Sequence, residues 1–204
     1  MSGSPVVCEL RDRYALVRLN RPAQLNRISE EMLTALESVF LDLNNDSKVV
    51  VVILTGTSGV FSAGADLAEI AQLTAPREYS LRGQALMSLI GRPERTSIAA
   101  IDGFCIGGGF DLALACDVRI ATARAIFQYP GARLGIITGW GGTVRLPRLI
   151  GTDAAKRILA TAERIDATNA LRLGIIDEIY EDIEFRARER AVAIVNRLKD
   201  TREI

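Results

Sequence analysis

The sequence contains no histidine, and this absence removes several kinds of catalytic site. Nucleophilic arrangements that pair serine or cysteine with histidine are excluded. The usual ligands of a catalytic zinc ion are missing as well, so we expect no metal site. Acid–base chemistry at neutral pH therefore falls to aspartate, glutamate, tyrosine, lysine or cysteine.

Aromatic residues and net charge are also scarce. Aromatics make up 5% of the 204 residues, and 25 basic side chains balance 25 acidic ones. Both features argue against a surface that binds nucleic acid or a membrane. No apolar run is long enough to span a bilayer, and the first residues do not resemble a signal peptide. We therefore expect a cytoplasmic protein with no nucleic-acid or membrane partner.

Cysteine is limited to three scattered residues, Cys8, Cys105 and Cys116. Their odd number and their spacing do not resemble a disulfide framework. We interpret them as small apolar residues of a protein kept in a reducing compartment.

Strand-like and helix-like stretches alternate along the chain, which predicts an α/β fold with largely parallel strand pairing. The predicted strands are residues 6–10, 15–19, 49–54, 97–101, 118–121 and 175–180. Helices are expected after Ser29, from Asp66, and over 76–91, 143–150, 153–161 and 182–199. The last of these is amphipathic, with an inward face of Ala187, Ala191, Ile194, Val195 and Leu198. No repeat or linker divides the chain, so residues 1–204 are predicted to form one domain.

The most informative stretch covers residues 103–117, where a buried run leads into Gly107, Gly108 and Gly109 and then into a helix-like segment. Without side chains, these glycines let a ligand lie directly on the backbone. The start of the helix offers unpaired N–H groups and partial positive charge, which suits a developing oxyanion. Asp111, in the first turn, is then the candidate base. A second interpretation stays open here: the glycines serve only to pack a strand tightly on a helix.

Other glycine-loop chemistries fit poorly. A phosphate P-loop needs Lys-Ser or Lys-Thr after its glycines, whereas Phe110 and Asp111 follow here. A dinucleotide fingerprint needs a different glycine spacing. A second glycine-containing loop, residues 61–66, also lies between a predicted strand and a helix. Two such loops could each aim one N–H group at a single oxygen atom.

A basic stretch follows the first loop. Between Val118 and Thr152 there is no aspartate or glutamate, and five arginines lie there: Arg119, Arg124, Arg133, Arg145 and Arg148. One interpretation is an oligomer surface, or pairing with acids elsewhere in the chain. The other is a basic rim that attracts an anionic ligand.

With both glycine loops present, the chain resembles the crotonase family, also called the enoyl-CoA hydratase/isomerase superfamily, from about residue 6 to residue 197. The matching segments are residues 19–22, 61–66, 101–117, 134–137, 141–143, 145–148 and 170–177. The resemblance implies a crotonase-type spiral of ββα turns and an acyl-coenzyme A thioester as the ligand. It also implies a homotrimer or a dimer of trimers.

The resemblance also assigns roles to individual residues. It implies that the backbone N–H groups of Ala65 and Gly108 form an oxyanion hole for the thioester, and that Asp111 is the catalytic carboxylate. Hydratases of the family carry glutamate at that position. The implied substrate and coenzyme A contacts are Ala23, Gln24, Leu25, Asn26, Ala63, Gly64, Asp66, Gly107 and Gly131. No separate cofactor is expected.

The sequence departs from the family pattern in its second acid. Gly131 stands where hydratases carry a second glutamate, and Gly139 stands where some isomerases carry an acid. One carboxylate therefore remains, which suits a one-base proton transfer, and a bound anion at the Gly131 position is one way to replace the missing group. The chain also stops after one terminal helix, without the further C-terminal helices of typical members.

Two aromatic residues near the glycines are first interpreted as structural. Tyr129 is expected to be a half-buried tyrosine rather than a proton donor, and Trp140 a packing or interface residue.

The function expected is that of an acyl-CoA enzyme of the hydratase or isomerase type. Hydrolysis or decarboxylation of an acyl-CoA could use the same oxyanion hole. The alternative is a non-catalytic protein that binds acyl-CoA or a partner.

Overall fold

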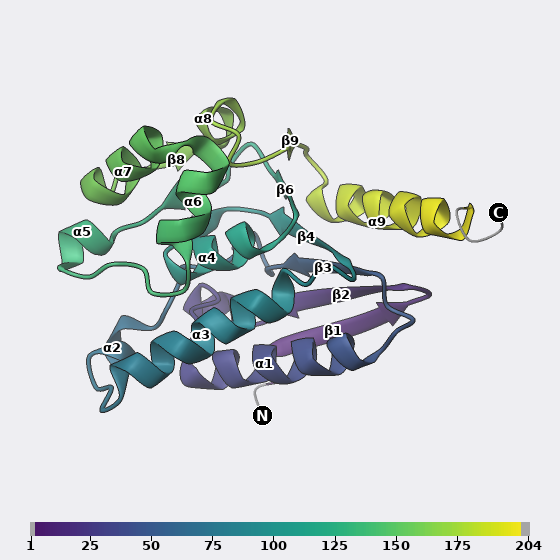
Figure 1. Cartoon of the computed structure of the whole chain (residues 1–204), viewed down its shortest axis with the longest axis horizontal. Coiled ribbons are helices and arrows are strands. Elements are labelled where there is room, and N and C mark those ends of the chain that lie inside the picture. The colour runs from purple at the N-terminus through teal and green to yellow at the C-terminus, as the bar shows by residue number, and fades with distance from the viewer. Residues whose placement is uncertain (1–2, 201–204) are drawn as a thin grey trace.

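A six-stranded sheet, mostly parallel, forms the centre of the computed structural model, which describes residues 3–200 and side chains up to residue 198 (Figure 1). Its strands run in the order β1 (Val6–Arg11), β2 (Tyr14–Leu19), β3 (Val51–Thr55), β4 (Thr96–Ile101), β6 (Val118–Ala121) and β9 (Glu178–Ile179). Only β1 and β2 pair antiparallel, as the predicted hairpin, and every other neighbouring pair is parallel. The predicted α/β class is confirmed. The single-domain prediction over 1–204 includes residues 1–2 and 201–204, which lie outside the described part.

A second, three-stranded sheet was not predicted from the sequence. It consists of β5 (Phe104–Ile106), β7 (Ile126–Gln128) and β8 (Ile165–Asp166). Strands of two or three residues are too short to show an alternating pattern. The predicted strand over 175–180 is wrong for its first half, because the N–H groups of Ile175 and Ile176 donate to Ala170 in the turn that follows a helix.

The helices largely follow the predicted pattern. They are η1 (Pro22–Gln24), α1 (Glu30–Asn45), α2 (Leu67–Ile70), α3 (Pro76–Ile90), α4 (Gly108–Ala115), α5 (Gly131–Leu134), α6 (Gly142–Ile150), α7 (Thr152–Thr161), α8 (Ala167–Arg172) and α9 (Ile183–Asp200). Ser29 caps α1 as expected, its side chain accepting a hydrogen bond from the Met32 N–H at 3.2 Å. The short helices α5 and α8 were not predicted, since neither is long enough to show a helical period.

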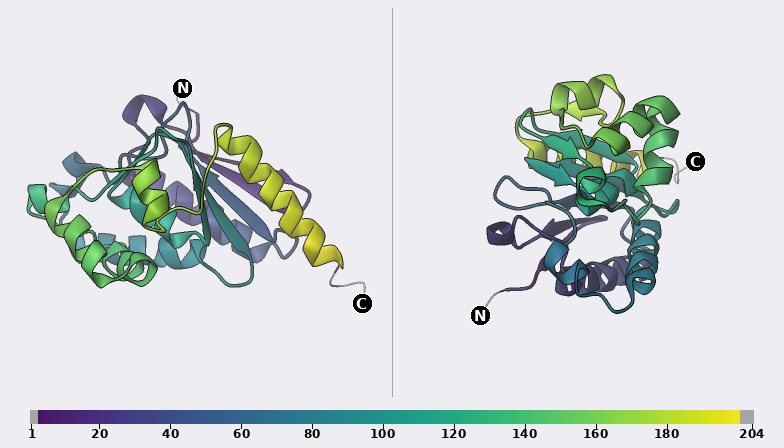
Figure 2. Two further views of the ribbon diagram at one scale, coloured as in Figure 1. Left: turned by 90° about the horizontal axis from the view of Figure 1, so that it is seen from above. Right: turned by 90° about the vertical axis from the view of Figure 1, so that its left-hand side faces the viewer.

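Helices cover both faces of the main sheet (Figure 2). Side chains that alternate along β3 divide between the two: Val52 and Leu54 join the core under α1 and α3, while Ile53 packs with Ala187 and Ala191 of α9. Burial on both faces explains why this strand is continuously apolar. The predicted inward face of α9 is confirmed for Ala187, Ala191 and Val195, and Ile194 is partly buried against the same core. Leu198 is 39% exposed and does not belong to it.

The three consecutive glycines have three different structural roles. Gly107 has φ +52° and precedes α4 in a conformation that favours glycine. Gly108 is the first residue of the helix. A side chain on Gly109 would meet the Ser62 carbonyl and Cβ at 2.7 Å, so Gly109 allows the helix to pack on the second glycine loop. Tight packing thus accounts for Gly109.

Replacing Gly109 by valine is therefore expected to destabilise the fold by about 1–3 kcal/mol, as overpacking of a close contact typically does. Urea unfolding at equilibrium measures this change. Gly3→Val is the control, since nothing lies within 4 Å of a side chain placed there. Equal stability of both variants would show that the Gly109 contact is not close in solution.

Candidate functional site

The two glycine loops meet at one cavity of about 470 Å³. Ser62 forms a β-bridge with Cys105, and the Ile106 N–H donates to the Ser62 carbonyl at 2.9 Å. These contacts place the loop between β3 and α2 beside the loop between β5 and α4. The cavity is lined by Arg27, Ala63, Gly64, Ala65, Leu67, Ala68, Ile70, Leu73, Pro76, Tyr79, Ser80, Ile106, Gly107, Gly108, Asp111, Tyr129, Pro130, Gly131, Ala132, Leu134, Ile136, Ile137, Thr138, Gly139, Trp140 and Leu159.

Two backbone N–H groups lie close together where these loops meet. A side chain on Gly64 would come within 3.1 Å of the Gly108 nitrogen, and one on Gly108 within 3.4 Å of the Ala65 nitrogen. Neither the Ala65 nor the Gly108 N–H donates a hydrogen bond to any acceptor in residues 3–200. Gly108 lies at the first position of α4, where N–H groups lack helical partners and carry partial positive charge. The pair can therefore stabilise one negatively charged oxygen atom.

Asp111 lies in the first turn of α4, with only 1% of its surface exposed. Its Oδ1 accepts a hydrogen bond from the Tyr129 hydroxyl at 2.9 Å, and its Oδ2 accepts one from the Thr138 hydroxyl. Burial raises the pKa of Asp111 from 3.8 to about 6, against the opposing effect of these hydrogen bonds and of Arg145. A carboxyl group with such a pKa can accept a proton and return it near neutral pH.

Tyr129 and Trp140 are more deeply buried than expected. Tyr129 is 3% exposed rather than half-buried, and burial beside Asp111 raises its pKa well above the ordinary value. Its hydroxyl therefore stays protonated and donates to the carboxylate. Trp140 is 4% exposed and packs on Tyr79 with ring centroids 5.4 Å apart, as the packing interpretation predicts, but it also lines the cavity.

The predicted coenzyme A contacts divide into two groups. Ala63, Gly64, Gly107 and Gly131 line the cavity together with Ala65, Gly108 and Asp111. The remaining predicted contacts, which do not line it, are Ala23, Gln24, Leu25, Asn26 and Asp66.

The second group nevertheless lies close to the loops. The Ala63 N–H donates to the Leu25 carbonyl at 2.9 Å, and the Asn26 side chain donates to Val60 at 2.7 Å. Asp66 caps α2 and forms a 3.1 Å salt bridge with Arg27. Thr138 and Arg27 were not singled out from the sequence, because no motif marked them; their place in the cavity arises from loops that only the fold brings together.

Two of the five arginines in the acid-free stretch pair with acids elsewhere. Arg119 lies 3.7 Å from Asp177 in a salt bridge, and the Arg124 Nε donates to Asp102 at 2.6 Å. The pairing interpretation is confirmed for these two.

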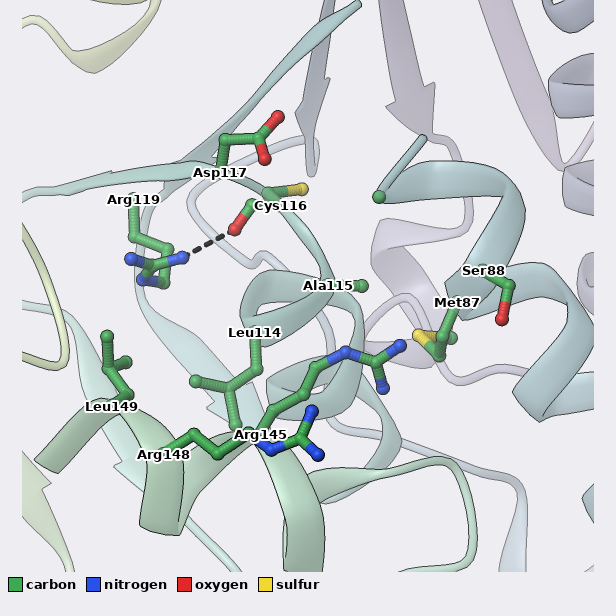
Figure 3. Close-up of a pocket in the computed structure, with 11 residues that line it drawn as sticks. Met87, Ser88, Leu114, Ala115, Cys116, Asp117, Arg119, Arg145, Arg148 and Leu149 are labelled. Carbon is green, nitrogen blue, oxygen red and sulfur yellow. Dashed lines mark hydrogen bonds between the residues drawn. The ribbon is translucent and has the colours of Figure 1, made fainter. Parts of the chain in front are cut away.

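Arg145 and Arg148 instead project from α6 into a separate cavity of about 490 Å³ that Arg119 also lines (Figure 3). Neither guanidinium forms a salt bridge with a carboxylate of residues 3–198. Arg145 donates to the Trp140 carbonyl at 3.1 Å. An anionic ligand or an oligomer contact at these arginines stays a prediction, as it does for Arg133.

The described cysteines fit the apolar interpretation in part. Cys105 and Cys116 are buried, and burial raises the pKa of both thiols. Cys8 on β1 is exposed, so the interpretation is wrong for this residue. No group of three or more potential ligands within the described residues could hold a metal ion, and no described helix is long and apolar enough to cross a bilayer.

Comparison with known proteins defines the class. The sequence model of the family described as "Enoyl-CoA hydratase/isomerase" matches residues 10–203. The chain is 37% identical over 196 residues to a short-chain-enoyl-CoA hydratase of Clostridium acetobutylicum, covering 95% of this chain and 75% of that protein. It is 42% identical over 202 residues to a putative enoyl-CoA hydratase/isomerase, YngF, of Bacillus subtilis, with 95% and 76% covered.

Solved structures agree with the sequence relatives. An enoyl-CoA hydratase from Bacillus anthracis superimposes with a TM-score of 0.89 at 35% identity, covering 94% of this chain and 76% of the other. The Pseudomonas aeruginosa protein DspI gives a TM-score of 0.90 at 33% identity, with 96% and 82% covered. The chain belongs to the enoyl-CoA hydratase/isomerase family and has the crotonase fold. It is an acyl-CoA enzyme of this type, and nothing in the comparisons favours the non-catalytic alternative.

Proposed function

We propose that this chain binds a 2-enoyl-CoA thioester with its carbonyl oxygen between the Ala65 and Gly108 N–H groups, and that Asp111 moves the proton at the α-carbon. The observation that carries the proposal is that two unpartnered backbone donors and one buried carboxyl group share a single cavity. Donors fixed before the reaction stabilise the enolate without reorganisation, and this is usually the largest contribution to catalysis in such sites.

Hydration of the double bond is the reaction we assign first. The Asp111 carboxylate takes a proton from water while the water oxygen bonds to the β-carbon. The electrons of the double bond move to the thioester oxygen, forming the enolate. Protonated Asp111 then gives its proton to the α-carbon, which restores the carboxylate and the neutral thioester. Relatives named "Short-chain-enoyl-CoA hydratase" and "Crotonyl-CoA hydratase" support a short acyl chain.

Isomerisation is the second candidate, because Asp111 is the one carboxylate among the described cavity residues. A single base can move a proton from one carbon to another through the same enolate. Supplying the purified protein with crotonyl-CoA and, separately, with a 3-enoyl-CoA distinguishes the two. Loss of the conjugated enoyl absorbance indicates hydration, and its appearance from the 3-enoyl substrate indicates isomerisation. If acyl-CoA binds but neither absorbance change occurs, the proposal is contradicted.

The setting of the enzyme is also part of the proposal. We infer a homotrimer or dimer of trimers in the cytoplasm, with coenzyme A entering only as part of the substrate. Molar mass from light scattering tests the assembly, and a monomer at working concentration would contradict it. A bound anion at the Gly131 position is the alternative to a site with a single carboxylate. Adding bicarbonate distinguishes the two: a higher rate would indicate the anion, and an unchanged rate would exclude it.

Activity should depend on pH through Asp111. The base must be ionised, and burial raises its pKa to about 6, so kcat/KM is expected to rise with pH through about 6 and then level off. Rates with crotonyl-CoA between about pH 5 and pH 8 measure this. A profile that falls with rising pH over this range would assign the reaction to a group that must be protonated.

A further inference from the structure

The loop that follows α5 brings an unexpected hydroxyl group to the catalytic carboxylate. Thr138 lies 27 residues after Asp111 in the sequence, yet its hydroxyl donates to Asp111 Oδ2. Tyr129 donates to the other oxygen at 2.9 Å. Both residues line the cavity, but Tyr129 is buried whereas Thr138 is partly exposed. The carboxylate therefore accepts a hydrogen bond on each oxygen, and Thr138 is the more exposed of its two partners.

The path of this loop depends on Gly131. The Ile136 N–H donates to the Gly131 carbonyl at 3.0 Å, so the chain folds back over α5. A Cβ atom on Gly131 would collide with the Ile136 carbonyl oxygen and lie 3.5 Å from the Ile137 Cα. Both are backbone atoms, and they cannot move aside without moving the loop. The Gln84 side chain holds the far end of the loop through the Gly139 carbonyl at 2.8 Å.

We propose that Gly131 and Thr138 act as a pair: the missing side chain at Gly131 admits the folded-back loop, and the loop places the Thr138 hydroxyl to position Asp111 in place of a second acid. This inference rests on the proposed function of Asp111. Thr138 is a positioning residue because it acts through the carboxylate. The loop can take this path only because residue 131 is glycine. A glutamate at position 131 would therefore displace Thr138 rather than complete a site with two carboxylates.

The surroundings of Asp111 leave this role to Thr138. The titratable and charged groups that face it are Tyr129 after β7, Cys105 on β5 and Arg145 on α6. The backbone of Gly142 in α6 lies close to it as well, since a Cβ atom there would come within 2.5 Å of Asp111 Oδ1. Cys105 and Tyr129 are buried and neutral, since burial raises the pKa of each. Unlike these buried groups, the Thr138 hydroxyl comes from a partly exposed loop that lines the cavity.

The direct test is Thr138→Val, which keeps the shape and removes the hydroxyl, compared with Thr138→Ser, which restores it. The rate of α-proton exchange of a saturated acyl-CoA in heavy water is followed against pH. Loss of a hydrogen bond that favours the ionised form should shift the midpoint of the Thr138→Val profile upward by about one pH unit or more. The rate should then fall about tenfold on the acidic side of the profile and less on the alkaline side. Thr138→Ser should return to the wild-type midpoint.

A matched control is Thr161→Val, at an exposed threonine whose hydroxyl donates to Arg157 within its own helix. It should leave the profile unchanged. Gly131→Ala and Gly131→Glu should both behave like Thr138→Val, because each displaces the loop. The proposal would be overturned if Gly131→Glu were more active than the wild type, or if bicarbonate stimulated the wild type. Either result would show that a second acidic group at that position promotes the reaction.

The positioning role can be separated from the proposed function by a readout that needs no turnover. The carboxyl carbon of Asp111, labelled with carbon-13, reports its ionisation by NMR. If the pKa of Asp111 is higher in Thr138→Val but no variant exchanges the α-proton, the positioning role is supported and the proposed catalysis is rejected. An unchanged Asp111 titration in Thr138→Val would overturn the inference, whatever the activity.

Discussion

Replacing Asp111 by asparagine is expected to reduce hydration and α-proton exchange by about 10²–10⁴-fold, the usual contribution of one general acid–base group. Acyl-CoA affinity should stay nearly intact, because the backbone donors of Ala65 and Gly108 are unchanged. Rates with crotonyl-CoA and binding of a saturated acyl-CoA, measured on the same preparation, test both parts. Asp153→Asn, at an exposed position in the first turn of α7, is the matched control.

The same substitution should stabilise the protein at neutral pH. The folded-state pKa of Asp111 is raised from 3.8 to about 6, so between these values the native state binds more protons than the unfolded state. Stability therefore falls as pH rises through this window. Asparagine carries no charge to bury, and the gain above about pH 7 is on the order of 3 kcal/mol, vanishing below about pH 4. Urea unfolding at the two pH values measures this gain in the free energy of unfolding. Full activity of Asp111→Asn would contradict the catalytic role of this carboxyl group. A loss of stability at neutral pH would contradict the cost assigned to burying its charge.

Replacing Ala65 by proline is expected to lower kcat by about 10²–10³-fold, because one oxyanion donor typically contributes about 2.7–4 kcal/mol in the transition state. Proline lacks the backbone N–H. The bridge between Ile28 and Ala65 uses the Gly64 carbonyl and the Asp66 N–H, so the substitution removes no hydrogen bond of the fold. The rate of hydration and the deuterium uptake at the α-carbon should fall together.

The control for this change is Ala65→Gly, which keeps the N–H and should retain most of the activity. Thermal unfolding of both variants shows whether proline disturbs the loop, since Gly64 before it has φ +86°. A folded Ala65→Pro protein with the wild-type rate would exclude the Ala65 N–H from the oxyanion hole.

The long elements of this fold could be predicted from the sequence. The continuous apolar run of β3 and the helical spacing of apolar residues in α1 and α3 are clear patterns, and all three elements lie close to where they were expected. The short strands β5, β7 and β8 could not be predicted. Each has only two or three residues, and the pairings of β5 with β7 and of β7 with β8 join segments that lie far apart in the chain.

The candidate site divides in the same way. Ala65 and Gly108 could be proposed from the sequence through the resemblance to the crotonase family. Asp111 could also be proposed from its place in the first turn after the glycines, where a helix start suits an oxyanion. Thr138 could not, because its partner lies on another element and no motif connects the two. Tyr129 was considered, but its burial and its hydrogen bond to Asp111 depend on the packing of β7 against α4.

The sequence by itself limited the class of chemistry: it has no histidine, and its two glycine loops predicted a backbone oxyanion hole with Asp111 as the base. Only the tertiary structure decided how that carboxylate is tuned. Its raised pKa arises from burial, and its two hydroxyl partners arrive from distant segments. Burial and long-range contacts are properties of the packed chain, so no local pattern of residues encodes them.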